Sequence, residues 1–226
     1  MRKILYLSIT LLVSFFVSLP AMADGVGLTI GFNGVAIDYQ KALSPKLNAR
    51  FMLSDMPLNR ETDEEGINYE VKYDRTNIGV LLDYYPMAGT FHLTAGMHAL
   101  DHNLELKAKS STGKYEIGDH VYTSNNLSLK GTVAFAKASP YLGLGWGNTI
   151  GHTGISGNLD LGVLYIGKPS VSYEASGTIS NGSISINVAQ YAPFLQDLEK
   201  ERASVENDLK DITVMPIIQF GITYQF

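Results

Sequence analysis

The feature that most constrains this chain is an alternation of apolar and polar residues that continues to its last residue. In the terminal segment, apolar or aromatic side chains occupy every even position from Ile218 to Phe226. The odd positions between them hold Gln219, Gly221, Thr223 and Gln225. Successive side chains of a β-strand point to opposite faces of the sheet. The segment is therefore predicted to be a strand with one apolar face and one polar or small face.

The same division recurs in five further segments, at 47–54, 77–84, 91–98, 142–147 and 158–165. Charged residues within these segments, such as Arg50, Asp83 and Asp160, fall only on the second face. Alternation with a period of two over most of the chain is typical of an all-β fold. It does not by itself show whether the apolar face meets a protein core or a lipid bilayer, because a soluble sandwich and a membrane barrel both produce it.

Other features of the sequence favour the membrane. Arg2 and Lys3 precede an apolar run over 4–19, and Ala21-Met22-Ala23 is typical of a signal peptidase site. We therefore expect a signal peptide at 1–23 and a mature domain at 24–226. After the signal, no apolar stretch approaches the roughly 18 to 20 residues of a spanning helix, so a mature membrane protein would have to be a closed barrel.

Composition agrees with this location. The chain has no cysteine although it carries an export signal. Aromatic residues lie at the ends of predicted strands, namely Tyr84, Tyr85, Trp146, Tyr165 and Tyr224. Outer-membrane barrels carry aromatic girdles at both interfaces. We predict an antiparallel transmembrane β-barrel in the bacterial outer membrane.

Charge and motifs exclude several functions. The formal net charge of −5 becomes −7 once Arg2 and Lys3 leave with the signal, which argues against nucleic-acid binding. His92 and His98 lie six residues apart on one strand face, about 20 Å, and so cannot share a metal ion. The sequence contains no HExxH, Gly-x-Ser-x-Gly or phosphate-binding loop. We expect no enzymatic activity, no metal and no cofactor.

The number of strands depends on two segments. Val26 to Leu43 is either one strand or a hairpin turning at Asn33-Gly34, and Val171 to Ser176 is either a strand or a loop. We predict eight strands, with ten as the alternative. Short connections at 44–46, 86–90, 138–140 and 167–169 are placed in the periplasm. Longer ones at 55–66, 101–126, 148–157 and 175–214 are placed outside the cell.

Between Pro193 and Asp211 the period changes to that of an amphipathic helix that begins at a proline. Its predicted apolar stripe consists of Leu195, Leu198, Val205, Leu209 and Ile212. We expect a solvated helix in the last long loop that leans on the barrel mouth. A plug or a surface that binds a partner is the alternative.

The candidate functional residues are those that the alternation directs into the barrel. They are Arg50, Asp83, His92, His98, Lys130 and Asp160. An eight-stranded barrel is only wide enough for its side chains to fill it, so these charges must be paired or hydrated. One interpretation is an ion-pair network that closes the lumen, and the other is a path for a cationic or zwitterionic solute. The acidic residues Glu61, Asp63, Glu64 and Glu65 are expected at the mouth or simply in a solvated loop.

Several segments resemble the small bacterial outer-membrane barrels of the CarO type, a family named for ornithine uptake and linked to carbapenem entry. They are the stretch 138–148 (ASPYLGLGWGN), the turn 167–171 (GKPSV), the charged helix and the closing 221–226 (GITYQF). The resemblance implies a narrow porin or uptake channel for small polar solutes such as basic amino acids. The alternative is a non-conducting barrel whose long loops and helix bind a partner or surface ligand.

The last residues resemble a recognition signal of this class. Ile222, Tyr224 and Phe226 look like the terminal pattern that the outer-membrane assembly machinery reads, although lipid-facing residues would have the same character. The expected partners are therefore outer-membrane lipid and lipopolysaccharide, the assembly machinery and small polar solutes.

Overall fold

A closed barrel forms one end of the molecule. The computed structural model describes residues 24–32, 34–55, 58–64, 67–110, 113–148, 150–181 and 184–226, so the predicted signal peptide lies outside the described residues. The barrel strands are β1 (Asp24–Gly31), β2 (Gly34–Ser44), β3 (Leu47–Asp55), β5 (Ile67–Tyr84), β6 (Phe91–Ser110), β10 (Ala138–Gly147), β11 (Gly154–Tyr165) and β15 (Val214–Gln225). They pair in the order β6-β10-β11-β15-β1-β2-β3-β5, and β5 pairs back onto β6. This confirms the prediction of an eight-stranded antiparallel barrel and excludes ten strands.

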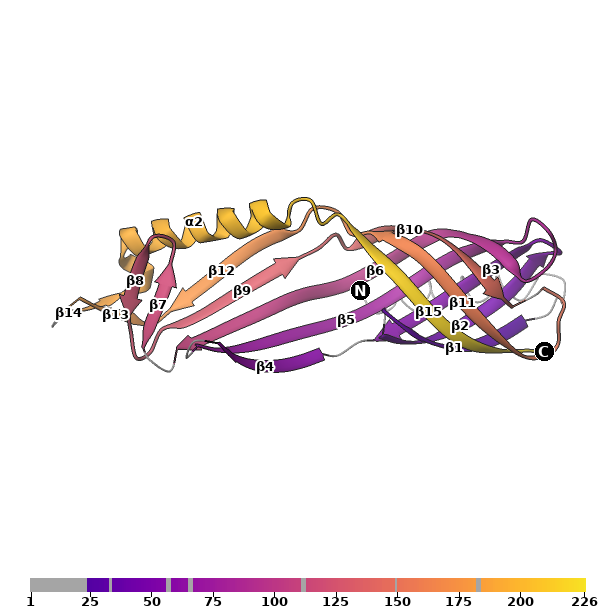
Figure 1. Cartoon of the computed structure of the whole chain (residues 1–226), viewed down its shortest axis with the longest axis horizontal. Coiled ribbons are helices and arrows are strands. Elements are labelled where there is room, and N and C mark those ends of the chain that lie inside the picture. The colour runs from indigo at the N-terminus through magenta and orange to yellow at the C-terminus, as the bar shows by residue number, and fades with distance from the viewer. Residues whose placement is uncertain are drawn as a thin grey trace, which may run out of the picture.

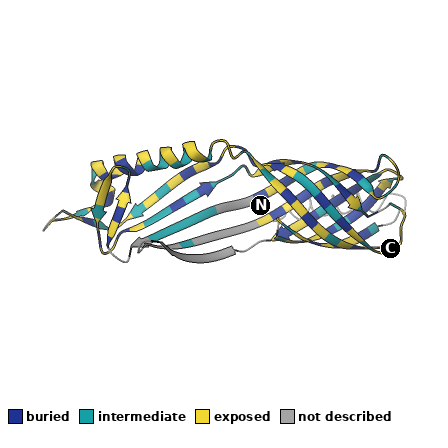
Figure 2. Ribbon diagram, in the orientation of Figure 1, coloured by how far each residue is buried: buried dark blue, intermediate teal, exposed yellow. Residues whose placement is uncertain are grey.

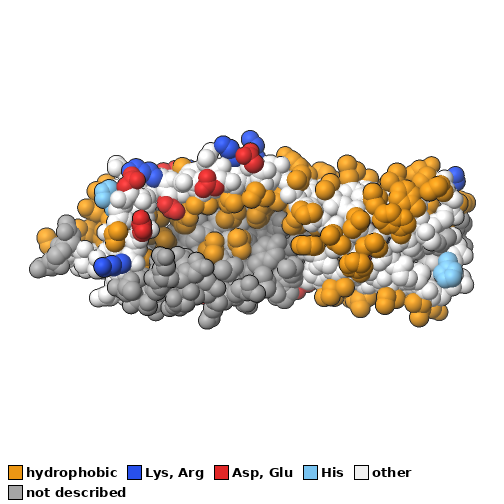
Figure 3. Space-filling view, viewed as in Figure 1, with side chains coloured by type: hydrophobic (Ala, Val, Ile, Leu, Met, Phe, Trp, Pro, Cys, Tyr) orange, Lys and Arg blue, Asp and Glu red, His pale blue; other side chains and the backbone are white. Residues whose placement is uncertain are grey.

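Burial follows the predicted alternation along the barrel strands (Figure 2). Leu28 and Phe220, on the outer face, are 59% and 58% exposed, whereas Thr29 and Gln219 next to them are buried. Apolar side chains also cover the barrel half of the space-filling view, and the charged ones gather on the other half (Figure 3). The apolar face therefore points outward, as in a membrane barrel and unlike a soluble sandwich.

The two ends of the barrel differ. At the end that we call the terminal end, the first and last strands meet, and Phe226 N donates to Asp24 O at 2.8 Å. The predicted short turns at 44–46 and 86–90 lie at this end. The opposite, extended end carries the hairpin between β1 and β2, where Gly34 has a φ of 81° and Asn33 is outside the described residues.

Three predicted connections are wrong. Residues 138–140 belong to β10, and 167–169 lie at the extended end rather than beside the termini. The 148–157 segment is the reverse case, because it turns at the terminal end and β11 already begins at Gly154. These errors have one cause. The prediction treats the strand before β10 as a barrel strand, although it lies outside the barrel. Each later connection is therefore predicted on the opposite side.

Those extra strands build an extension beyond the barrel (Figure 1). β5 and β6, with 18 and 20 residues, run on past the barrel wall to a length of about 60 Å at ~3.3 Å per residue. β4 (Leu58–Glu64) pairs with β5, β9 (Ser128–Ala134) pairs with β6, and β12 (Ser170–Ser176) pairs with β9. The segment Val171 to Ser176 is therefore a strand, but it lies outside the barrel.

A smaller sheet and the helix complete the extension. The sheet contains β7 (Lys114–Ile117), β8 (His120–Thr123), β13 (Thr178–Asn181) and β14 (Ile184–Asn187). It is followed by the 3-10 helix η1 (Val188–Gln190) and by α2 (Ala192–Leu209). Their shared core consists of Tyr115, Ile117, Leu127, Ile179, Val188, Phe194 and Leu198. The extension therefore has its own apolar interior.

The helix forms as predicted, but its apolar face and its position differ. Pro193 lies in its first turn, where a missing N–H costs no hydrogen bond. Phe194 and Leu198 are its buried apolar residues, whereas Leu195 and Ile212 of the predicted stripe are exposed. α2 packs on β12, β7 and η1 within the extension rather than on the barrel mouth. The predicted stripe contained Leu195 in place of its neighbour Phe194, and therefore missed the buried residue.

Candidate functional site in the barrel interior

An arginine crosses the middle of the barrel. Arg50 points inward from β3 and is 1% exposed. Its Nη2 donates to Asp83 Oδ1 on neighbouring β5 at 2.9 Å, and its Nη1 donates to Asp160 Oδ2 on β11 at 2.8 Å. β11 and β3 lie four positions apart in the ring of eight strands, so they face each other. The Arg50–Asp160 ion pair therefore spans the lumen.

Further polar side chains hold both carboxylates in place. Asp83 also accepts from Thr94 Oγ1 at 2.7 Å and from Asn48 Nδ2 at 3.4 Å. His92 Nε2 lies 3.0 Å from Asp160 Oδ1. Buried charges are stable only when they are paired and hydrogen-bonded, and this network supplies both conditions. It joins four of the six predicted residues, Arg50, Asp83, His92 and Asp160.

A third carboxylate, which is not among the predicted residues, lies in the interior. Asp38 on β2 is buried and accepts hydrogen bonds from Gln40 Nε2 at 2.7 Å and from Thr29 Oγ1 at 3.1 Å. Gly27 makes room for it, because a Cβ at that position would lie 2.4 Å from an Asp38 oxygen. The alternation in β2 could have identified Asp38, because Asp38 and Gln40 occupy alternate positions and therefore point to the same face of the strand.

His98, the fifth predicted residue, takes part in a separate contact. Its Nδ1 lies 2.9 Å from Asn77 Oδ1, and its ring packs edge-on against Tyr141, with the ring centroids 5.5 Å apart. Near the terminal end, Tyr85 packs on the His92 ring at 5.1 Å and donates to the Asn148 carbonyl oxygen at 2.8 Å. Aromatic and imidazole rings thus fill the barrel on both sides of the Arg50 network.

An apolar layer closes the interior toward the extended end. Its members point inward from five barrel strands and from the residue after β11, and they are Leu81, Leu100, Tyr141, Leu164, Ile166 and Ile217. Leu164 is 0% exposed. This layer was not predicted, because the candidate residues for the lumen were all polar. A solute that crosses the barrel has to pass both the ion pairs and these side chains.

Lys130, the sixth predicted residue, lies elsewhere. It is on β9 in the extension, and its Nζ is 3.0 Å from Glu105 on β6. The prediction for Lys130 is wrong because β9 is not a barrel strand. The structure therefore does not bring Lys130 together with Arg50.

The residues of the predicted assembly signal lie on the outer face. Ile222, Tyr224 and Phe226 are all exposed, and the rings of Tyr224 and Phe226 have centroids 6.3 Å apart. Their recognition by the assembly machinery stays a prediction. Of the predicted acidic segment, Glu61, Asp63 and Glu64 lie in β4, and Glu65 falls outside the described residues.

Two further observations apply to the described part of the chain. No group of three or more His, Cys, Asp or Glu side chains is placed there to hold a metal ion. No helix in that part is long and apolar enough to span a bilayer.

Together these features define a class, the closed eight-stranded membrane β-barrel with a charged, packed interior. The particular fold is that of CarO. The chain aligns with the crystal structure of Acinetobacter baumannii CarO at a TM-score of 0.56 and 17% identity, over 92% of this chain and 98% of that one. With A. baumannii CarO2 the TM-score is 0.59 and the identity 16%, over 92% and 100% of the two chains. No family model matches the sequence, and no curated protein matches it.

Proposed function

We propose that the chain is exported by its first 23 residues and works in a bacterial outer membrane as a narrow channel for small polar solutes, basic amino acids among them. Six of the eight barrel strands have 8 to 12 residues, a length that suits an apolar band about 25 Å tall when the strands are tilted. The observation that carries the proposal is the buried set of three carboxylates, Asp38, Asp83 and Asp160, against the single guanidinium of Arg50 inside a wall that is apolar outside.

The acidic excess favours cations over anions. A solute that carries an ammonium or guanidinium group can replace Arg50 as the partner of Asp83 or Asp160, so the carboxylates exchange partners and are never left unpaired. Four buried polar atoms have no hydrogen-bond partner among the described residues: Arg50 Nε, Ser54 Oγ, Asn77 Nδ2 and Asn158 Oδ1. Because buried polar groups are normally satisfied, these atoms support a hydrated interior.

The apolar layer keeps the flux low. Hydrophobic constrictions in channels hinder ions by excluding water. Substituting Leu100→Ser should wet the layer and raise conductance. Leu93→Ser is the matched control, since Leu93 lies on the same strand and faces outward. If both variants conduct alike, the layer does not limit passage.

Two assays on the purified mature chain test the channel. We expect small, cation-selective single-channel currents in planar bilayers under a KCl gradient. We also expect liposomes that contain the protein to swell faster in ornithine than in glutamate. Heat-modifiable migration on a gel shows that each preparation is folded. Currents that favour chloride would contradict the role given to the interior carboxylates.

A non-conducting barrel is the second candidate, and one observation favours it. The Arg50–Asp160 pair spans the lumen, and the apolar layer closes it toward the extended end. Both the ion pair and the apolar layer would have to move for a solute to pass. In that case the extension would carry the function by binding a partner or surface ligand. Silence in both assays from demonstrably folded protein would favour this candidate over the channel.

The proposed location brings its own partners. The outer face would contact lipid and lipopolysaccharide, and Ile222, Tyr224 and Phe226 would be read by the assembly machinery during insertion. Replacing Phe226 with Ser should reduce the folded, heat-modifiable fraction in bacterial outer membranes more than the same replacement of Phe220. Equal losses would mean that both residues act only as lipid contacts.

A further inference from the structure

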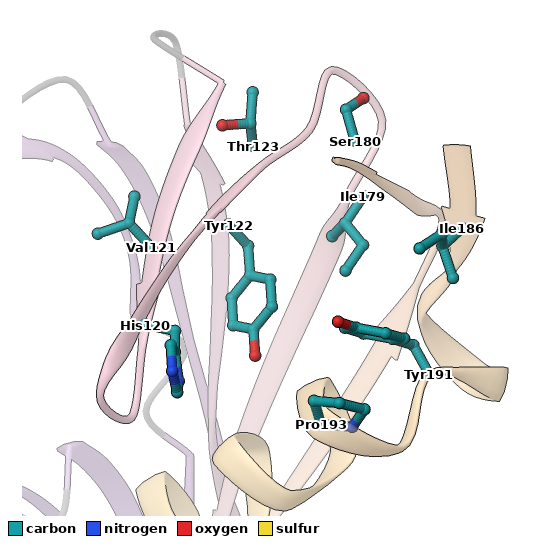
Figure 4. Close-up of a pocket in the computed structure, with 9 residues that line it drawn as sticks. All are labelled: His120, Val121, Tyr122, Thr123, Ile179, Ser180, Ile186, Tyr191 and Pro193. Carbon is teal, nitrogen blue, oxygen red and sulfur yellow. The ribbon is translucent and has the colours of Figure 1, made fainter. Parts of the chain in front are cut away.

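The outer tip of the extension contains a cavity of about 240 Å³, which we call the tip pocket (Figure 4). Its walls come from β8, β13, β14, the residue before α2 and the first turn of α2. The lining residues are His120, Val121, Tyr122, Thr123, Ile179, Ser180, Ile186, Tyr191 and Pro193. Figure 1 places these elements at the end of the molecule opposite the C-terminus. The pocket is therefore remote from the barrel interior.

A buried carboxylate holds two of the lining side chains. The Asp197 side chain on α2 is 4% exposed, and its Oδ2 accepts from Tyr122 Oη at 2.6 Å and from His120 Nδ1 at 2.7 Å. Lys200 Nζ lies 3.4 Å from the other oxygen and also bridges to Asp119 at 2.9 Å. With Nδ1 bonded to Asp197, Nε2 is the ring nitrogen of His120 that remains for a ligand. The polar groups of the pocket are thus held in position before any ligand arrives.

The hairpin that carries His120 and Tyr122 approaches the helix very closely. Gly118, in the turn between β7 and β8, has a φ of 59°, and a Cβ there would lie 3.1 Å from the Asp197 Cβ. The ring of Tyr122 also packs edge-on against Phe194, with the centroids 5.1 Å apart. A glycine that permits close approach and an aromatic contact therefore fix one wall of the tip pocket to α2.

The chemistry of the walls restricts the ligand. None of the nine lining residues is Lys, Arg, Asp or Glu, and both Asp197 oxygens already have donors, so a charged ligand finds no free counter-charge. A wholly apolar ligand would remove water from His120 Nε2 and from the Tyr191 hydroxyl without replacing its hydrogen bonds. The ligand must therefore be neutral, with apolar faces and a polar edge.

From these walls we infer that the tip pocket binds one neutral hexopyranose unit of a glycan. The C–H faces of such a ring suit the tyrosine rings, which combine an apolar face with a polar tip. In Figure 4 the side chains of Tyr122 and Tyr191 enter the same space from β8 and from the segment before α2. The ring's hydroxyls can bond to His120 Nε2 and to the Tyr191 hydroxyl, which points toward Tyr122 in Figure 4. At about 240 Å³ the cavity is smaller than most drug-sized sites, which fits a single sugar ring.

Saturation-transfer NMR with the full mature chain tests this inference. The protein should be held in micelles of an amine-oxide detergent, because maltoside and glucoside detergents carry sugar headgroups. The probes are the methyl α-pyranosides of glucose, galactose and mannose. We expect transfer to the ring C–H protons of at least one of them, with a Kd of about 1 mM because the contact surface is small. If none of the three receives transfer, the inference is wrong.

Variants separate ring stacking from hydroxyl contacts. Tyr191→Ala should weaken binding by about tenfold or more, whereas Tyr191→Phe should stay within about threefold because the ring remains. Ile186→Trp should abolish detectable binding, because the indole ring fills a cavity of about 240 Å³. Ile184→Trp is its matched control, since Ile184 lies on the same strand, is exposed and does not line the pocket.

Two controls keep the result interpretable. Tyr191 also packs against the core of the extension, so an unchanged amide spectrum must accompany each variant. Ile186→Trp tests the pocket even if Tyr191→Ala fails to fold. Equal loss in Ile186→Trp and Ile184→Trp, or binding of phenol in place of the sugars, would overturn the sugar assignment. None of these results depends on whether the barrel conducts.

Discussion

Apolar and polar residues alternate in both the barrel and the extension, but the face that is polar in one is apolar in the other. Strand β6, which passes through both regions, shows this reversal. In the barrel its even residues, His92, Thr94 and His98, are polar and face inward, and the odd residues face out. From Leu104 the even positions are apolar, with Leu104, Leu106 and Ala108 half-buried, while Glu105 and Lys107 take the odd ones. The same faces of one strand thus exchange character within a few residues.

The difference shows what surrounds each part of the strand. An apolar outer face is stable against hydrocarbon, and a charged outer face is stable against water. The exchange between Leu100 and Leu104 therefore marks the height at which β6 leaves the proposed bilayer. Beyond it the extension buries its apolar face under α2 and the small sheet, as a soluble domain does.

The largest expected effect is in the barrel interior. Arg50→Ala leaves Asp83 and Asp160 buried without their cation, which typically costs about 3 to 5 kcal/mol. We expect a fall of that size in the free energy of unfolding, measured by urea titration in micelles with the intensity of the folded gel band. Asp83→Ala should cost less, because Arg50 keeps Asp160. If both variants match the wild type in stability and flux, the inward network does not hold the barrel.

A charge placed on the outer face of β6 tests the change of polarity directly. Met97→Lys puts a lysine on the lipid side of the barrel, where the cost is about 2 to 4 kcal/mol near the bilayer midplane. Glu105→Lys has the same parity beyond Leu100 and should cost about 1 kcal/mol or less, since it loses only a half-exposed ion pair. Refolding yields into lipid vesicles measure both. Equal costs would place Met97 outside the hydrocarbon.

Much of the barrel could be read from the sequence, because parity alone assigns each strand residue to lipid or lumen. Arg50, Asp83, His92, His98 and Asp160 were found in this way. Lys130 was misplaced because parity says which face a residue occupies but not which sheet its strand joins. Asp197 and the tip pocket could not be found at all, since they depend on long-range contacts between β8 and α2 that have no local signature.

The tip should respond to acid independently of the barrel. Hydrogen bonds from Tyr122, and then from His120 and Lys200, lower the pKa of Asp197 below its usual value. A carboxyl with a depressed pKa in the folded state contributes stability above its unfolded pKa and loses it as the pH falls through the folded value. Below about pH 4 we therefore expect faster hydrogen exchange at β8 and the start of α2. Asp197→Asn should show this loosening at pH 7 and lose most of the pH dependence.

The smallest effect is expected at Lys130, and it sharpens the contrast with Arg50. Both are cations paired with carboxylates, but the Lys130 side chain is 32% exposed and its partner Glu105 is 35% exposed. Exposed pairs are typically worth about 0 to 1 kcal/mol because water screens them. Lys130→Ala should therefore change the free energy of unfolding by no more than that and leave ornithine-driven swelling unaltered. A loss comparable to that of Arg50→Ala would mean that the extension, rather than the lumen, controls the stability and passage attributed here to the barrel interior.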